Sequence, residues 1–242
     1  MLRQAMGEGG EIGNHSLDHR YDLARLSPGL QHRQIVEAQD RIEASLGTRP
    51  VGFRAPGYML SNALISTVRA AGLRYDASLF PCPSYYAAKL AVIGLLRARG
   101  TPSRSVVDDP RVLLAPTEPY SPSARDFRRP SAGIAASGGL VEIPMRVVGR
   151  GRWPVIGTSL TLAPGPVFRA LVEAAIHTPT VSLGLHGLDF LDRKDVGGRL
   201  AEKQVDLRVP VEAKLARLTH CIERLREAGF AFSDLRSLAE AS

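Results

Sequence analysis

The chain has 242 residues, a length that suits one large domain, and α/β barrels of this size fold as single units. Hydrophobic residues make up 44% of it and charged residues 23%, which are ordinary values for a globular protein. No uninterrupted apolar run approaches the length that crosses a bilayer, so the composition predicts a soluble chain and excludes a membrane-spanning one.

The formal net charge is +7, and most of it lies in one stretch. Between Arg97 and Arg152 there are ten arginines and five acidic residues, which gives a local net charge of +5. The stretch is rich in proline, serine and glycine, so residues 100–138 are predicted to form a loop or insertion rather than an aromatic-studded surface for nucleic acid. We expect no nucleic-acid partner, whereas peripheral contact with an anionic surface stays open.

Short apolar runs alternate with longer amphipathic segments, a pattern typical of βα units around a mainly parallel sheet. The predicted strands are residues 11–14, 51–54, 74–80, 140–148, 180–185 and 230–233. The predicted helices are residues 28–46, 61–71, 84–98, 165–176 and 210–228. No repeat and no short linker divides the pattern, so residues 1–242 are expected to form one domain.

Two further features bear on the compartment. The segment "MLRQAMGEGGEIG" has no apolar core and no small-residue cleavage site, so it is not expected to be a signal peptide. Cys82 and Cys221 lie far apart in the sequence and in no metal-binding pattern, which favours buried thiols. We therefore expect a cytoplasmic or peripheral membrane location.

The segment "EIGNHSLDH" follows the first predicted strand and carries His15 and His19. On a helical turn, residues at i and i+4 share a face, so both imidazoles could converge on one cation. Two ligands do not make a site, because a catalytic zinc takes three protein ligands and an open position for water. A structural role for the pair stays open, His32 and His220 have no partner at metal spacing, and His177 is expected to offset a helix dipole.

Polar residues follow other predicted strands, where catalytic groups of βα folds belong. In "RAPGY", Arg54 offers a guanidinium that can fork onto a carboxylate, and the turn after it can present backbone N–H groups. In "LHGLD", His186 is a candidate general acid at a strand end. Asp76 could accept a hydrogen bond from a histidine and raise its pKa.

In this order, "GEGGEIGNHSLDH", "GFRAPGY", "YDASLF" and "LGLHGLDF" resemble successive motifs of the polysaccharide deacetylases, the NodB homology domain of carbohydrate esterase family 4. The resemblance covers residues 7–192 by motif. It implies an α/β fold of the distorted (β/α) barrel type. It also implies a divalent metal, often zinc, that helps to hydrolyse an N-acetyl or related acyl group from a sugar.

The resemblance also implies roles for particular residues. His15 and His19 match the two metal-binding histidines, and Arg54 matches the arginine that orients the catalytic aspartate. Asp76 matches the aspartate that tunes the acid, and His186 matches the general acid that protonates the leaving amine.

Two substrate contacts follow from the same resemblance. Tyr58 or Gly57 stands where a backbone N–H contributes to the oxyanion hole, although many relatives have tyrosine directly after the proline. Leu185 matches the apolar residue that lines the pocket for the acyl methyl group.

The family's first motif, a strand ending in an Asp-Asp pair that supplies the base and the third metal ligand, has no counterpart before His15. The chain is expected to be a fragment without its first βα unit, a catalytically inactive relative, or an enzyme in which another acid substitutes. Candidate substitutes are Asp108 and Asp109 in the basic stretch, Asp18 in the histidine motif, and Asp189 and Asp192 near His186. None is convincing, because Asp108 and Asp109 read as a solvated turn and Asp18 would face away on a helix.

The sequence therefore predicts a metal-dependent hydrolase that removes an acyl group from a sugar, glycan or lipid-linked sugar, with weak metal binding and little or no activity in residues 1–242. A non-catalytic carbohydrate- or metal-binding relative is the alternative. A basic surface-binding protein that acts through Arg125, Arg128 and Arg129 is a third hypothesis. Neither the individual substrate nor the oligomeric state follows from the sequence.

Overall fold

The structure is a computed structural model that describes residues 2–100, 107, 109–131, 139–196, 198, 202 and 204–242. It divides into two compact units, which are described separately. The first comprises Met1–Pro144 and Ser233–Ser242, and the second comprises Met145–Phe232. This division does not decide whether residues 1–242 fold as one domain, so that expectation stays a prediction.

The first unit contains a three-stranded parallel sheet in the order β1-β2-β3. Its strands are β1 (Gly52–Phe53), β2 (Tyr75–Asp76) and β3 (Val141–Glu142). Phe53 pairs with Asp76, and Asp76 pairs with Glu142. On the outer side of β1, Asn14 forms a parallel bridge to Phe53. The register therefore places the histidine motif, "RAPGY" and "DAS" at one edge of the sheet.

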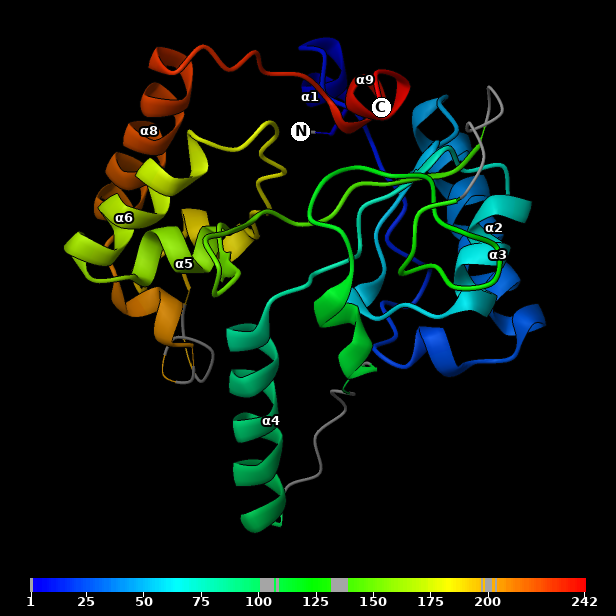
Figure 1. Cartoon of the computed structure of the whole chain (residues 1–242), viewed down its shortest axis with the longest axis horizontal. Coiled ribbons are helices and arrows are strands. Elements are labelled where there is room, and N and C mark those ends of the chain that lie inside the picture. The colour runs from blue at the N-terminus through cyan, green and yellow to red at the C-terminus, as the bar shows by residue number, and fades with distance from the viewer. Residues whose placement is uncertain are drawn as a thin grey trace. The chain divides into compact units, whose positions relative to one another are not determined.

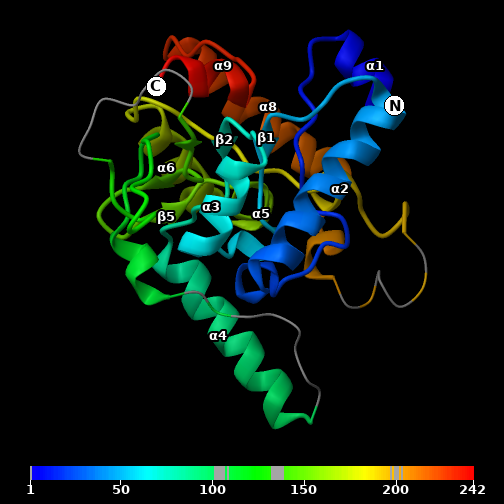
Figure 2. The ribbon, with the colours of Figure 1, turned by 90° about the vertical axis from the view of Figure 1, so that its right-hand side faces the viewer.

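Five α-helices belong to the described part of the first unit: α1 (Leu2–Gly7), α2 (Pro28–Leu46), α3 (Asn62–Ala70), α4 (Pro83–Ala98) and α9 (Leu235–Glu240). Helix α2 begins with a proline in its first turn and ends at Gly47, which has φ 77° in the left-handed region that glycine adopts readily. Helices α2 and α3 lie side by side in both views (Figures 1 and 2). The buried side chains Leu23, Ile35 and Leu64 pack in the main core beneath them.

The second unit has an antiparallel pair of strands, β4 (Val147–Val148) and β5 (Trp153–Pro154), and a parallel bridge between Ile156 and Gly184. The α-helices found in its described residues are α5 (Gly157–Leu162), α6 (Gly165–Ala175) and α8 (Val211–Glu227). Their apolar faces form one core that includes Leu160, Val172 and Leu218. Within the portion of the chain that the structure describes, no helix is long and apolar enough to cross a membrane.

The predicted helices are confirmed to within about two residues, because each has a clear apolar face and a start or stop signal. The strands are shorter than predicted: the 11–14 run contributes only the bridge at Asn14, and residues 230–233 are irregular. The apolar pattern indicates that a run is buried, whereas the length of its ladder depends on partner strands that the pattern does not specify. The α/β class is confirmed, whereas the barrel and the missing first βα unit stay predictions.

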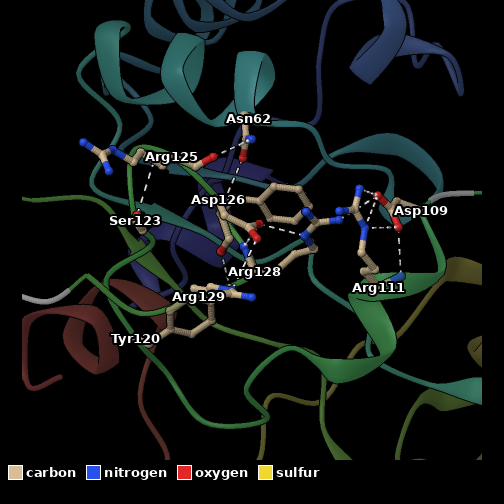
Figure 3. Close-up of polar contacts among 10 residues, drawn as sticks. Asn62, Asp109, Arg111, Tyr120, Ser123, Arg125, Asp126, Arg128 and Arg129 are labelled. Carbon is tan, nitrogen blue, oxygen red and sulfur yellow. Dashed lines mark hydrogen bonds and ion pairs between the residues drawn. The ribbon is translucent and has the colours of Figure 1, made fainter.

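The 100–138 segment, predicted as a loop or insertion, contains ordered elements in its described residues. It contains a 3₁₀ turn (Pro110–Leu114) and bridges that pair Tyr120 with Glu142 and Pro122 with Pro130. Tyr120 is buried and donates a hydrogen bond from its hydroxyl to the carbonyl of Phe127 at 2.6 Å (Figure 3). The described part of this segment is therefore anchored to β3.

Candidate functional site

The histidine motif forms a tight loop rather than a helical turn. Asn14 fixes its start, since its N–H donates to Gly52 O at 2.8 Å and its side-chain amide donates to Ile35 O at 2.8 Å. Ser16 and His19 then take φ values of 67° and 50°. Such left-handed backbone is uncommon outside glycine and occurs at functional sites. The helical geometry assumed for this motif is therefore wrong.

The loop nevertheless brings the two histidines together. The ring centres of His15 and His19 lie 4.8 Å apart, in an edge-to-face arrangement. His15 Nδ1 lies 2.7 Å from the carbonyl oxygen of Arg54. A carbonyl only accepts, so the contact requires a proton on Nδ1 and puts the lone pair of the neutral ring on Nε2. Metal-binding histidines are commonly oriented by such a backbone acceptor.

A second contact joins the histidine loop to "RAPGY". The ring of Tyr21 lies 5.2 Å from that of His19 and packs against Gly57, where a Cβ atom would stand 2.7 Å from Tyr21 Cδ1. Gly57 has φ 67°, so both its backbone and its lack of a side chain suit this position. Tyr58, at φ 62°, packs its ring against Phe80 at 5.3 Å.

Asp18 is not placed as a base. Its carboxylate accepts a hydrogen bond from the Gln34 amide at 2.7 Å, and its N–H donates to the Gln34 side-chain oxygen at 3.0 Å. This two-way contact with α2 holds the loop. The prediction that Asp18 would face away on a helix is wrong in its geometry, because the residue lies in a bend.

Arg54, Ser78 and Asp76 connect "RAPGY" to "DAS". Arg54 Nε donates to the carbonyl of Ala77 at 2.8 Å. The N–H of Ala55 donates to the Ser78 hydroxyl at 2.7 Å, and that hydroxyl donates to Asp76 Oδ1 at 2.5 Å. Three sequence motifs thus join in one hydrogen-bonded network that runs from His15 to Asp76.

Glu142 completes this network and was not predicted as a site residue. Asp76 and Glu142 are fully buried, and they are register partners on β2 and β3. Asp76 Oδ2 and Glu142 Oε2 have no hydrogen-bond partner, whereas Glu142 Oε1 accepts from the N–H of Leu79 at 2.9 Å. A proton between the two carboxyl groups would satisfy both oxygens.

The surroundings shift the pKa of both carboxyl groups. Burial raises both pKa values, and the nearby Asp76 charge raises the pKa of Glu142 further. Hydrogen bonds and the Arg54 guanidinium work in the opposite direction on Asp76. The pKa of Glu142 therefore lies well above its usual range. The one sequence signal for this was a glutamate inside the apolar run "LVEIPMRVV".

His186 and Leu185 lie in the second unit and are exposed. They follow the bridge at Gly184, and the N–H of His186 donates to Asp189 Oδ2 at 2.7 Å. Lys214 is buried on α8, and its Nζ donates to the carbonyls of Leu188 and Leu191 at 2.7 Å each. These contacts fix the backbone that carries His186.

Neither neighbouring aspartate was found to hold the His186 ring. Asp189 accepts from the backbone of His186 and caps the 3₁₀ turn Gly187–Phe190. Asp192 accepts from the N–H groups of Lys194 and Val211, and these bonds lower its pKa. These contacts of Asp189 and Asp192 hold the backbone around them.

Asp109 forms part of a different network (Figure 3). This network lies in the arginine-rich 100–138 segment, which we call the basic segment. It accepts from Arg111 and Arg128, and Arg128 also pairs with Asp126 at 2.7 Å. The Arg111 hydrogen bonds in particular hold the pKa of Asp109 well below its usual range, so the carboxylate stays charged and paired. Asp108, the other candidate, lies outside the described residues.

The histidine pair does not complete a metal site by itself. Imidazole nitrogens suit zinc, but zinc in proteins takes three or four protein ligands. Among the described residues, no group of three or more histidine, cysteine, aspartate or glutamate side chains is arranged to hold a metal ion. His15 and His19 alone would leave such a set incomplete.

Comparison with known proteins adds to this geometry. The sequence model of the family described as polysaccharide deacetylase matches residues 1–75. The peptidoglycan deacetylase-like protein FGM2 of Gibberella zeae is 38% identical over 71 residues, which are 29% of this chain and 21% of that protein. Both the histidine pair and Arg54 lie within the residues that the family matches.

A solved structure shares the fold. The crystal structure from Mycobacterium smegmatis described as a polysaccharide deacetylase superposes with a TM-score of 0.53 at 16% identity, and the alignment covers 99% of this chain and 65% of that one. The chain thus spans less than two thirds of either relative. The two sequence matches thus cover 75 and 71 residues of this chain, in agreement with the motif resemblance there, and the solved structure adds a shared fold.

Proposed function

We propose that this chain is a metal-dependent hydrolase of the deacetylase type, which removes an N-acetyl or similar acyl group from a sugar, glycan or lipid-linked sugar. The observation that carries the proposal is the orientation of His15 on the Arg54 carbonyl, with the His19 ring 4.8 Å away. Metal-binding histidines are commonly oriented by such a backbone acceptor.

The cofactor in this proposal is a divalent metal, and zinc suits the imidazole donors. When bound, such a metal polarises the acyl carbonyl and lowers the pKa of a water molecule. His15 and His19 would hold it through their ring nitrogens.

The remaining steps belong to the chain's own residues. Arg54 fixes the histidine loop through its carbonyl and β2 through its guanidinium. The N–H of Tyr58 donates to the Ala55 carbonyl at 3.2 Å, so the N–H of Gly57 would be the one to meet a developing oxyanion, and Leu185 would line the acyl pocket. His186 would protonate the leaving amine. Asp76 would act on the Arg54 turn through the Ser78 hydroxyl.

Acyl hydrolysis by residues 1–242 would be impaired. The described residues offer no third ligand and no convincing base, since Asp18 pairs with Gln34 and Asp109 pairs with two arginines. We expect weak metal binding and little or no acetate release. The location we propose is the cytoplasm or a membrane periphery, where a lipid-linked sugar would be accessible.

The same lack of a base favours one alternative, a non-catalytic carbohydrate- or metal-binding relative. Such a relative would keep the histidine pair but would not hydrolyse the acyl group. Binding of an N-acetylated glucosamine oligomer without acetate release, at all metal concentrations, would distinguish it from an impaired enzyme.

The test is acetate release from N-acetylated glucosamine oligomers by residues 1–242, with and without added Zn²⁺. We expect a trace rate that depends on Zn²⁺ and disappears in His15→Ala. The matched control is His32→Ala, because His32 is an exposed histidine on α2 away from the network.

Two outcomes would count against the proposal. Acetate release that survives His15→Ala would show that the histidine pair is not the site. High turnover by residues 1–242 would contradict the expectation of an impaired chain and require a base that the structure has not revealed.

A further inference from the structure

Helix α4 presents a face to solvent that carries no charge. The helix extends away from the rest of its unit in both views (Figures 1 and 2). Leu90, Val92 and Leu95 are exposed by 54%, 56% and 51%. The other exposed residues of this face are small: Ala87, Ala88, Ala91, Gly94 and Ala98. A water-facing helix surface is ordinarily polar, so this face is typical of a surface that something covers.

The one charged residue of α4 before Arg97 is turned toward the body of the unit. Lys89 Nζ lies 3.3 Å from the carbonyl oxygen of Gly57 and 5.6 Å from the Tyr85 ring centre. Tyr86 and Ile93 are buried on the same side. The inner face of the helix is thus anchored to its unit, and the outer face is apolar.

The charge around α4 has a single sign. No acidic residue occurs between Asp76 and Asp108, while this interval has four basic residues. Two of them, Arg97 and Arg99, are exposed at the end of the helix. The basic segment that follows is different, because there Arg128 is neutralised by two aspartates (Figure 3).

We propose that the outer face of α4 docks on an anionic lipid bilayer. Apolar side chains beside exposed arginines, in a sequence interval without acidic residues, match the acyl boundary and the charged headgroups of such a surface. Sixteen residues of helix span about 24 Å, which is shorter than the roughly 30 Å hydrocarbon core, so the helix lies in the interface and does not cross it. The apolar character of the face disfavours nucleic acid, and the docking is independent of the histidine site.

The test is co-sedimentation of the whole chain with vesicles of phosphatidylcholine alone and with added phosphatidylglycerol. We expect binding to the anionic vesicles only, weakened by salt. Arg97→Gln with Arg99→Gln should weaken it by about fivefold per arginine, and Val92→Gln with Leu95→Gln should weaken it by at least about tenfold. The matched control, Arg125→Gln with Arg129→Gln, removes two exposed charges from the basic segment and should leave binding unchanged.

A fluorescent label distinguishes insertion from surface attraction. NBD attached at Leu95→Cys should shift to the blue on anionic vesicles, whereas NBD at Leu30→Cys, an exposed leucine on α2, should not. Cys82 and Cys221 are buried, which keeps the labelling selective.

Three results would overturn the proposal. One is absence of binding to anionic vesicles by the unaltered chain. Another is equal loss of binding in the α4 arginine variant and in the basic-segment control. The third is a dimer in sedimentation velocity that the Val92 and Leu95 substitutions dissociate while vesicle binding is absent, which would assign the face to a second copy of the chain.

Discussion

Two aspartates of the same unit have pKa values that their surroundings shift in opposite directions. Asp76 is fully buried beside Glu142, and burial raises its pKa. The Asp109 side chain is 33% exposed, and its arginine partners lower its pKa. Because each aspartate is held by its own network, the difference lies in burial and partner rather than in the residue.

This contrast separates proton handling from stabilisation. A buried pair of carboxyl groups that shares one proton responds to neighbouring charge, as catalytic groups do. A carboxylate clamped by two guanidinium groups stays charged across the ordinary pH range and orders its segment instead. The predictions that follow test this contrast, beginning with the largest effect.

The largest effect is expected at Glu142. Glu142→Ala removes the acceptor of the Leu79 N–H and leaves Asp76 as a buried charge without its partner. We expect a loss of about 3–5 kcal/mol in the free energy of unfolding, measured with urea. Glu142→Gln keeps an acceptor and supplies a neutral donor to Asp76, so it should cost about 1 kcal/mol. Equal losses in the two variants would contradict a shared proton.

Ser78→Ala should be next. The hydroxyl of Ser78 links Asp76 to the Ala55 N–H in a buried position, and its loss leaves both groups without this partner. We expect about 2 kcal/mol of lost stability. Ser123→Ala is the matched control in the basic segment, because its hydroxyl accepts one exposed hydrogen bond from Arg125. A similar cost for both serines would remove the distinction between the two networks.

The two networks should respond to pH with opposite sign. Folding raises the pKa of Asp76 and Glu142, so the folded state binds more protons and the stability that this pair supplies is lost as pH rises above about 4–5. Folding lowers the pKa of Asp109, so its contribution is lost as pH falls below about 4. Unfolding curves from pH 3 to 8 should show a shallower alkaline loss in Glu142→Gln. An unchanged slope would argue against a raised pKa.

Asp109→Asn should have the smallest effect. It removes a charge that is exposed to solvent and leaves Arg128 paired with Asp126. We expect a small loss of thermal stability at pH 7 that disappears in acid, and salt should reduce it. A loss as large as that of Ser78→Ala would mean that the basic segment supports the fold more than its contacts indicate.

The sequence predicted what local chemistry determines. The helix predicted at residues 28–46 is confirmed, because its apolar stripe, its first-turn proline and Gly47 act within the segment itself. The motif order around His15, Arg54 and Asp76 located a network that the structure joins by hydrogen bonds.

The sequence did not reveal what tertiary pairing determines. The histidine loop takes left-handed backbone at Ser16 and His19 because Asn14 and Gln34 hold it, and no local pattern predicts that. Glu142 joins Asp76 only through the register of two strands that lie far apart in the chain. The apolar outer face of α4 is visible only once Tyr86 and Ile93 are known to point inward.

The most direct test of the central claim is a Zn²⁺ titration followed by NMR of the histidine ring nitrogens. If His15 and His19 are metal ligands, a ring nitrogen of each should shift on the first additions of Zn²⁺, with Nδ1 of His15 remaining protonated on the Arg54 carbonyl. The shifts should disappear in His15→Ala, and the His32 ring should not respond before them. Shifts of all histidines together, or none at His15 and His19, would contradict the assignment of this pair as the functional centre.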